Sequence, residues 1–300
     1  MAKSGEALIR GIDIDKLAKG FADEASLLKG LVVQSSTTAR EIRWYSKTAG
    51  FLDSVDSTTI TLSQIANVSP LSLPTVVEQS WTRNTSYVKK FFVESPTISA
   101  EDIADSDVDV LATNVRDLVR AVANQVDIRI YSVLIEAAAA TPTTPSPSVT
   151  LSTASIADGW DDELTGNPIK DIMTGNRKIR AQGFDTNSII LYINPIEHEN
   201  LLNYLINVKG SSIPSFSSEK VKTGVVMEIL GNQVVVSQNA TSDYALQFIP
   251  NFSCMWKSFM PITSVVIDDP GIGKKIRVWE EGEALLTYPK SVHQITDTVV

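Results

Sequence analysis

Residues 93–137 read VESPTISAEDIADSDVDVLATNVRDLVRAVANQVDIRIYSVLIEA. Within this stretch, Ser99-Ala100-Glu101-Asp102 is similar to a capping box, the pattern with which many helices begin. Apolar residues then recur at steps of three and four, which predicts a helix with one apolar stripe. They are Val108, Leu111, Val115, Leu118, Val119, Val122, Val126, Ile130, Val133 and Leu134. We expect the helix to run from Asp107 to Ala138, about 48 Å if unbroken, with its narrow stripe lying across one face of a sheet.

The charged residues of this stretch support the same helix. The face opposite the stripe is expected to carry Arg116, Asp117, Arg120, Asp127 and Arg129. Three acidic residues, Asp105, Asp107 and Asp109, stand near the N-terminal end, where the helix dipole favours anions. Their alternation is also that of a calcium-binding EF-hand loop, but the position that needs glycine in such a loop is Val110 here. We therefore interpret them as part of a helix start.

The residues before the helix predict an extended hairpin preceded by an arm. Roughly helix-spaced apolar residues in the first 35 positions are interrupted by glycines, each of which costs about 1 kcal/mol inside a helix. Residues 38–97 are rich in Ser, Thr and β-branched residues, which favours strands at Ser57–Leu62 and Thr75–Val93. Few of these side chains can be buried, so we expect a long, two-sided hairpin that projects from a body. The alternative is a tight turn centred on Asn84, with Trp81 opposite Tyr87.

The residues after the helix predict an α/β region. Thr141–Ser148 is a stiff connector of Pro, Ser and Thr. Asn167-Pro168 predicts the start of a helix that ends before Gly183, and Pro195 predicts the start of a second. Strands are expected at Ser188–Ile193, Val225–Ile229, Gln233–Ser237, Tyr244–Ile249, Ile262–Ile267, Lys275–Val278 and Ala284–Tyr288.

The composition of the 300-residue chain excludes several classes of protein. Its 26 Lys and Arg against 35 Asp and Glu leave a net charge of −9, which makes it a poor electrostatic partner for nucleic-acid phosphates. No apolar run is long enough for a membrane helix, and the N-terminus lacks the apolar region of a secretory signal. The single cysteine, Cys254, excludes an intrachain disulfide framework. The two histidines, His198 and His293, leave little for metal or acid–base chemistry, which favours a structural or binding role.

Two short motifs resemble functional sequences but lack an essential residue. Gly271-Ile272-Gly273-Lys274-Lys275 resembles part of a phosphate-binding loop, but the earlier glycine position is Asp268 and the Ser/Thr position is Lys275. We interpret it as a turn between strands. His198-Glu199 could begin a zinc-protease motif, but the second histidine position is Leu202, so we expect His198 to be a surface residue beside Glu197.

Two further features allow only weak hypotheses of chemistry. Asp161-Asp162-Glu163 could hold a cation, although a solvated loop is the favoured interpretation. Cys254 stands among Phe252, Met255 and Trp256, which favours a buried, inert thiol over a nucleophile. The remaining carboxylates cannot be placed in one cleft from the sequence. We therefore assign no catalytic, cofactor-binding or metal-binding residue and expect no enzyme activity.

The predicted parts follow the order arm, polar hairpin, capped helix, connector, α/β region and closing strands. In this order the chain resembles the major capsid protein of tailed bacteriophages, an α+β fold of the Hong Kong type. The resemblance is carried by Val93–Ile103 leading into Asp105-Ser106-Asp107, by Asn124–Tyr131, by Ile189–Asn194 with Pro195 and Leu201-Leu202, and by Gly231–Ser237. It covers most of the chain, in the order of its elements rather than in fixed motifs.

The resemblance implies five parts of the chain. They are an N-terminal arm at 1–37, an extended β-hairpin loop at 38–98, the spine helix of the peripheral domain with its connector at 99–148, a mainly apical α/β domain at 149–261, and closing strands at 262–300 that return to the peripheral domain.

The resemblance also implies a function. Such a protein self-assembles through pentamers and hexamers into an icosahedral virus shell that encloses double-stranded DNA, and it is assembled in the host cytoplasm. Expected partners are further copies of the chain, a portal, a possible decoration protein and a separate scaffolding protein, since the arm is too short to hold a scaffolding segment. DNA would be contacted weakly and without sequence specificity. No membrane and no cofactor are expected.

Some relatives join their subunits by an isopeptide bond between a lysine of the extended loop and an asparagine. Lys89 and Lys90 are the lysine pair of this region, but no partner motif can be assigned, so we expect no cross-link. Three other interpretations stay open. They are the shell of a bacterial nanocompartment that encloses a cargo enzyme, a carbohydrate-binding β-rich module, and a hydrolase with dispersed carboxylates.

Overall fold

The computed structural model describes residues 27–49, 71, 80–105, 110–135, 152–155, 158–162, 164–185, 188–208 and 228–299. The chain divides into two compact units. Unit 1 comprises Met1–Ile42, Tyr87–Ile130 and Trp256–Ala284, and unit 2 comprises Arg43–Ser86, Tyr131–Met255 and Leu285–Val300. Each unit has its own sheet and its own hydrophobic core.

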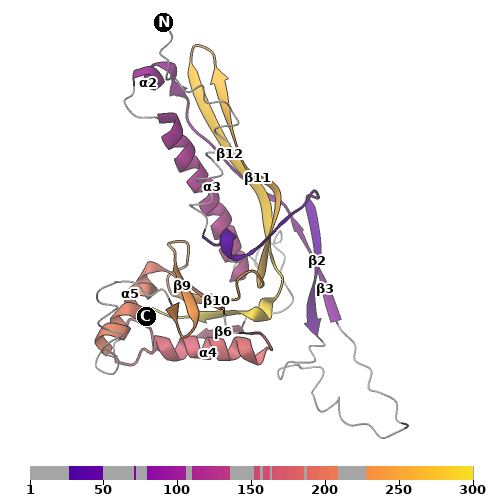
Figure 1. Cartoon of the computed structure of the whole chain (residues 1–300), viewed down its shortest axis with the longest axis vertical. Helices are drawn as coiled ribbons and strands as arrows, with labels where there is room; N and C mark the ends of the chain where they lie inside the picture. The colour runs from indigo at the N-terminus through magenta and orange to yellow at the C-terminus, as the bar shows by residue number, and fades with distance from the viewer. Residues whose placement is uncertain are drawn as a thin grey trace. The chain divides into compact units, whose positions relative to one another are not determined.

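Unit 1 is built on a five-stranded sheet with the order β1-β11-β12-β4, in which β5 also pairs with β12. Its elements are a 3₁₀ turn, η1 (Lys29–Leu31), and the strands β1 (Val33–Ser36), β4 (Lys89–Glu94), β5 (Ile98–Ser99), β11 (Cys254–Asp269) and β12 (Gly273–Leu286). β12 runs antiparallel to β4, with Glu281 opposite Lys90. Figure 1 shows β11 and β12 as a long hairpin alongside helix α3 (Val110–Leu134).

The predicted long helix is confirmed as α3, which follows the short α2 (Ala100–Asp105). Its stripe is buried as expected, at Val115, Val119, Val122, Val126 and Ile130. α3 ends at Leu134, before the predicted end at Ala138, and Ile135 lies in a turn. The alanines that follow are strong helix formers and contain no stop signal for a sequence prediction. Positions 107–109 and 136–138 of the predicted helix lie outside the described residues.

The stripe of α3 forms the core of unit 1 against the sheet. The cluster contains Ile98, Val115, Val119, Val122, Ile262, Ile276 and Val278. Burial of one such side chain contributes about 1.5–3 kcal/mol, so this contact is a main source of the unit's stability. Arg116, Asp117 and Arg120 are exposed as predicted. Asp127 and Arg129 were expected on the same face, but they are buried because other segments of unit 1 cover them.

A two-stranded sheet, the β2–β3 ribbon, is formed by β2 (Glu41–Ala49) and β3 (Ser80–Tyr87). It confirms a strand within the second predicted range, Thr75–Val93, but the partner of this strand is Glu41–Ala49, where no strand was predicted. Asn84 lies inside β3, so the alternative of a tight turn at Asn84 is wrong. The single strand expected over Thr75–Val93 is divided, because the chain pairs with β2 up to Tyr87 and with β12 from Lys89 onward. The strand expected at Ser57–Leu62 lies outside the described residues.

The closing strands of unit 1 are longer than the sequence predicts. β11 contains the expected strand Ile262–Ile267, and β12 joins the strand expected at Lys275–Val278 to the one expected near Ala284–Tyr288. The residues between these two, Glu280-Glu281-Gly282-Glu283, have the composition of a loop. They form a strand because each of the three carboxylates finds a cationic partner in the folded unit.

Unit 2 contains a six-stranded sheet with the order β6-β13-β10-β7-β9-β8. Its strands are β6 (Ser152–Ser155), β7 (Ile190–Ile193), β8 (Glu228–Ile229), β9 (Asn232–Val236), β10 (Tyr244–Phe248) and β13 (Val292–Thr296). β7 is parallel to β9 and β13 is parallel to β6, whereas β10 is antiparallel to β7 and β13. β6 and β13 have no counterpart in the prediction, since Ser, Thr, His and Gln dilute their apolar pattern.

The helices of unit 2 begin where the sequence predicts. They are α4 (Pro168–Ala181) and α5 (Pro195–Asn203), and a short π-helical turn, η4 (Tyr204–Val208), follows α5. The Asn167 side chain accepts a hydrogen bond from the Lys170 amide at 3.2 Å, and the Asn194 side chain accepts one from the Ile196 amide at 3.2 Å. These caps satisfy amides that have no partner inside their helix, which fixes where each helix starts.

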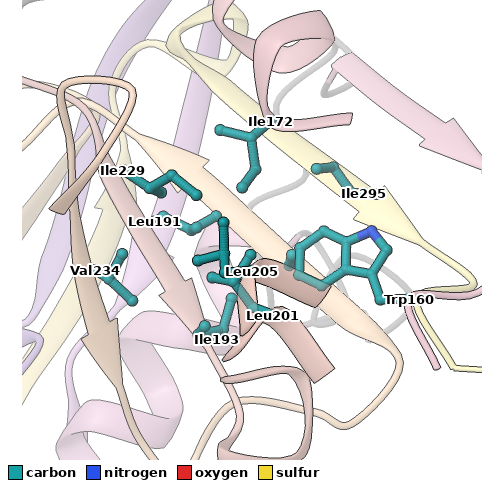
Figure 2. Close-up of a cluster of buried hydrophobic side chains, with 10 residues drawn as sticks. Trp160, Ile172, Leu191, Ile193, Leu201, Leu205, Ile229, Val234 and Ile295 are labelled. Atoms are coloured by element: carbon teal, nitrogen blue, oxygen red, sulfur yellow. The ribbon is translucent and has the colours of Figure 1, made fainter. Parts of the chain in front are cut away.

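Figure 2 shows the hydrophobic core of unit 2. The cluster contains Trp160, Ile172, Leu191, Ile193, Leu201, Leu205, Ile229, Val234, Ala245 and Ile295. Leu201 and Leu205 belong to this core, and Leu202 packs against it. The buried Trp160 indole donates a hydrogen bond to the Asp171 carboxylate at 3.0 Å, so its one polar atom is satisfied.

Candidate functional site

Strand β12 carries three buried carboxylates within four residues. We call Glu280–Glu283 the acidic segment. The side chains of Glu280, Glu281 and Glu283 are 1%, 6% and 0% exposed. Glutamate is almost never fully buried unless it is paired, because removing one charge from water costs several kcal/mol. The partners of these carboxylates therefore identify the chain segments that the acidic segment holds in place.

Glu280 holds residues 27–29, the first residues of unit 1 that the structure describes, which we call the entering segment. Its Oε1 lies 2.5 Å from Lys29 Nζ. Nearby, the Asp127 carboxylate accepts hydrogen bonds from the backbone amides of Leu27, Leu28 and Lys29 at 2.7, 3.2 and 3.1 Å. These amides stand at the start of η1, where helical turns have unsatisfied donors. A carboxylate from α3 thus caps a turn about a hundred residues away in the sequence, and this explains why Asp127 is buried.

Glu283 holds α3. The Arg129 guanidinium donates to Glu283 Oε1 from both Nε and Nη2, at 2.9 and 2.6 Å. Burial raises the pKa of Glu283, and the positive charge of Arg129 acts in the opposite direction. Burial lowers the pKa of the nearby Lys89 ammonium, which also interacts electrostatically with Arg129 and Glu283. The pair explains why Arg129 is buried although the periodicity of α3 places it outside the apolar stripe.

Glu281 holds the base of the β2–β3 ribbon. Arg40 Nη2, just before β2, lies 3.5 Å from Glu281 Oε2, and Lys90 Nζ, just after β3, lies 3.7 Å from Glu281 Oε1. Both cations also lie over aromatic rings. The Arg40 guanidinium is 5.0 Å from the centre of the Phe259 ring, and Lys90 Nζ is 5.1 Å from that of Phe92.

The acidic segment therefore joins four parts of the chain to one strand. They are the entering segment at Lys29, the two ends of the ribbon at Arg40 and Lys90, and the end of α3 at Arg129. Each of its carboxylates pairs with a cation of the same unit, so the arrangement fixes the positions of these segments on β12. Among the residues described, no group of three or more His, Cys, Asp and Glu side chains could hold a metal ion. No helix in the described part of the chain is long and apolar enough to cross a membrane.

The glycine-rich motif lies where a turn was predicted, between β11 and β12. Gly271 has a positive φ of 80°, and the Ile272 amide donates to the Asp269 carbonyl at 3.0 Å. A shallow cavity of about 190 Å³ beside the turn is lined in part by Asp268, Asp269 and Lys274. Two carboxylates at its wall oppose phosphate binding, in agreement with the interpretation as a turn.

The histidine motif does not form a metal pair. His198 lies in α5 but is half-buried rather than at the surface, and burial lowers its pKa. Leu202 stands one turn later. Glu197, the neighbour of His198 in the chain, is fully buried. Its Oε1 accepts a hydrogen bond from the Asp243 amide at 2.5 Å, and this contact explains the burial.

The two weaker candidates are structural. Asp162 stabilises its own turn: its Oδ1 accepts from the Leu164 amide at 2.8 Å and its Oδ2 accepts from the Thr165 hydroxyl at 2.6 Å. These hydrogen bonds lower the pKa of Asp162. Glu163 lies outside the described residues. Cys254 is buried at the start of β11, as predicted.

The chain belongs to the phage capsid protein family, which matches it over residues 97–283. The match contains α3, most of β12 and most of unit 2, and it covers more than half of the chain. Membership makes the protein a structural component of a phage capsid that assembles with copies of itself into a shell. Neither the nanocompartment nor the carbohydrate-binding alternative is favoured by this family. Among curated proteins, none matches the chain.

Solved structures share the fold at low sequence identity. A chain of Mycobacterium phage Ogopogo is 16% identical with a TM-score of 0.64, and the alignment covers 91% of this chain and 92% of that chain. A chain of the mature capsid of bacteriophage PhiM1 is 15% identical with a TM-score of 0.63, and the alignment covers 92% of this chain and 88% of that chain. A chain of a virus-like particle from Pyrococcus furiosus is 9% identical with a TM-score of 0.62, and the alignment covers 95% of this chain and 98% of that chain. These similarities concern the fold, and they confirm the α+β capsid fold predicted from the sequence.

Proposed function

We propose that the chain is the repeating subunit of an icosahedral shell that forms through pentamers and hexamers and encloses double-stranded DNA. The observation that supports this most is the acidic segment, which fixes the entering segment, both ends of the ribbon and α3 to one strand. A subunit that tiles a closed shell must meet several neighbours through different surfaces. Segments that leave a rigid unit at fixed points suit such contacts. A two-stranded ribbon is marginally stable alone and would gain stability by lying on a neighbouring copy.

The division of labour along the chain follows from this proposal. Residues 1–37 act as an arm, 38–98 as an extended loop, 99–148 as the spine helix with its connector, 149–261 as a mainly apical domain, and 262–300 as closing strands. The arm and the extended loop make contacts between subunits. The spine helix and the closing strands form the rigid part of the peripheral domain.

The remaining partners belong to the same proposal. A separate scaffolding protein, a portal and a possible decoration protein take part in assembly, which occurs in the host cytoplasm. Packaged DNA is contacted weakly and without sequence specificity, because a chain of net charge −9 has little electrostatic attraction for phosphates. The protein works through shape and contact area, without a catalytic step, a cofactor or a cross-link.

The test is production of the full chain alone and together with candidate scaffolding proteins of its virus, followed by cryo-electron microscopy of the particles. We expect closed shells with capsomers at five-fold and six-fold positions. A chain that stays monomeric at high concentration with every scaffold would contradict the proposal. DNA-free particles that always contain the same co-purifying enzyme would contradict the DNA-enclosing function and support a nanocompartment.

A further inference from the structure

Glu281 is paired differently from the other carboxylates of the acidic segment. Its two ion pairs are 3.5 and 3.7 Å long, whereas those of Glu280 and Glu283 are 2.5 and 2.6 Å long. Its cationic partners Arg40 and Lys90 are 72% and 52% exposed, but Arg129 is 9% exposed. The Oε2 atoms of Glu281 and Glu283 both make no hydrogen bond, so the difference lies in the length of the ion pairs and in the exposure of the cations. Glu281 is thus a buried anion whose cations stand in solvent.

The two cations belong to the two ends of one ribbon. We call Arg40–Ile42 and Tyr87–Lys90 the ribbon base. The Val88 amide donates to the Arg40 carbonyl at 2.9 Å, which joins the two ends at the backbone. At the level of side chains, the Glu281 carboxylate links the two ends, since one of its oxygens faces each cation.

We propose that Glu281 is a positioning residue that clamps the two ends of the β2–β3 ribbon together, and that rising salt concentration releases this clamp. Ion pairs with exposed cations are weak and are screened by salt, whereas buried, hydrogen-bonded pairs are screened much less. Salt therefore loosens the ribbon base and leaves the Arg129–Glu283 pair intact. This has a consequence for shell assembly, which rests on the proposed function: salt would control how firmly the ribbon base is held to β12.

The test is amide hydrogen exchange of the full-length, unassembled chain, read by mass spectrometry at about 50 mM and about 500 mM NaCl, where the screening length falls severalfold. The wild type is compared with Glu281→Gln, which removes the charge, and Glu281→Asp, which keeps it. Glu94→Gln is the matched control, because it breaks the exposed Glu94–Arg277 ion pair between the same two strands, away from the ribbon base.

At low salt we expect Glu281→Gln to speed exchange in the ribbon base by about two- to tenfold, the effect of losing two exposed ion pairs. Glu281→Asp restores most of the protection, because the long Arg40 and Lys90 side chains can follow a shorter acid. At high salt the wild type approaches Glu281→Gln. Peptides from α3 keep the same exchange rate in all variants. This result would show that Glu281 positions the ribbon base and does not simply stabilise the whole unit.

Three results would overturn the inference. They are unchanged exchange of the ribbon base in Glu281→Gln, an equal effect of Glu94→Gln there, or faster exchange throughout unit 1. The experiment uses unassembled protein, so its outcome does not depend on shell formation. A salt-dependent ribbon base in a chain that never forms shells would disprove the proposed function and leave the clamp standing.

Discussion

Arg129 and Glu283 form a buried, doubly hydrogen-bonded ion pair between residues that lie 154 positions apart in the sequence. The guanidinium comes from α3 and the carboxylate from β12. A planar guanidinium that donates twice to one carboxylate fixes both position and orientation, which a single contact does not. The pair therefore sets where the C-terminal part of the helix stands on the strand, in addition to the contacts of the apolar stripe.

Arg129→Met removes the hydrogen-bonded cation of the buried Glu283, and we expect the free energy of unfolding at pH 7 to fall by about 3–5 kcal/mol. Burial already raises the pKa of Glu283 in the folded state, and loss of the cation raises it further. A raised folded pKa means that stability is fully present below the unfolded pKa and is lost as the pH rises through the folded one. The variant should therefore recover part of its loss at pH 5, as measured by urea unfolding at both pH values.

The control is Arg120→Met, on the exposed face of the same helix, for which we expect a change within about 0.5 kcal/mol. Equal effects of the two substitutions would show that the buried pair has no special role. A pH-independent loss in Arg129→Met would show that Glu283 does not titrate as its burial implies.

Asp127→Asn replaces a carboxylate that accepts three backbone amides with a group that has one acceptor oxygen. At least one of the amides of Leu27, Leu28 and Lys29 then loses its partner, which costs about 1–3 kcal/mol locally. We expect faster amide exchange at residues 27–29 with little change in the sheet. Asp117→Asn, at an exposed position of α3, should leave that exchange unaltered. Full protection of residues 27–29 in Asp127→Asn would rule out the capping role.

The long helix and the capsid fold could be predicted from the sequence because their signals are local. The valines of the α3 stripe recur at helical spacing within one short window, and the order of elements is enough to identify the fold. One strand of the ribbon, β3, was predicted for a similar reason, since the Ser, Thr and β-branched residues of this region favour a strand, whereas its partner β2 was not predicted. Its division at Val88 was not predicted, because the change of partner from β2 to β12 has no sequence signal.

The acidic segment could not be predicted because its partners are distant in sequence. Lys29 and Glu280 are 251 positions apart, and helical periodicity places Arg129 on the polar face of α3. Glu-Glu-Gly-Glu is typical of a loop, so the sequence prediction broke β12 at that point. The available hint was its position between two apolar strand segments without proline or asparagine to form a turn.

Gly282→Ala tests the close packing behind the acidic segment. A Cβ atom on Gly282 would lie 2.4 Å from Cζ2 of the buried Trp256 and 2.9 Å from the Lys257 carbonyl oxygen. Either the indole or the strand must move, and we expect a loss of about 1–3 kcal/mol in unfolding free energy, measured by urea titration. Gly30→Ala is the control, because a Cβ there meets nothing within 4 Å. If the two substitutions destabilise equally, the contact with Trp256 is not what requires glycine.

Gly175→Ala tests the packing of α4 on the sheet of unit 2, where a helical glycine would ordinarily be improved by alanine. The added Cβ would lie 1.6 Å from Gln247 Oε1 and 2.6 Å from His293 Cδ2. Gln247 also donates to the Ile172 carbonyl at 3.2 Å, so its side chain is not free to move aside. We expect a net loss of about 1–3 kcal/mol in spite of the gain of about 1 kcal/mol in helix propensity. The double variant with Gln247→Ala removes the overlap with Gln247 and keeps the one with His293, so its loss of stability should be smaller than the sum of the losses of the two single variants. A rise in melting temperature for Gly175→Ala alone would show that α4 does not approach the sheet this closely.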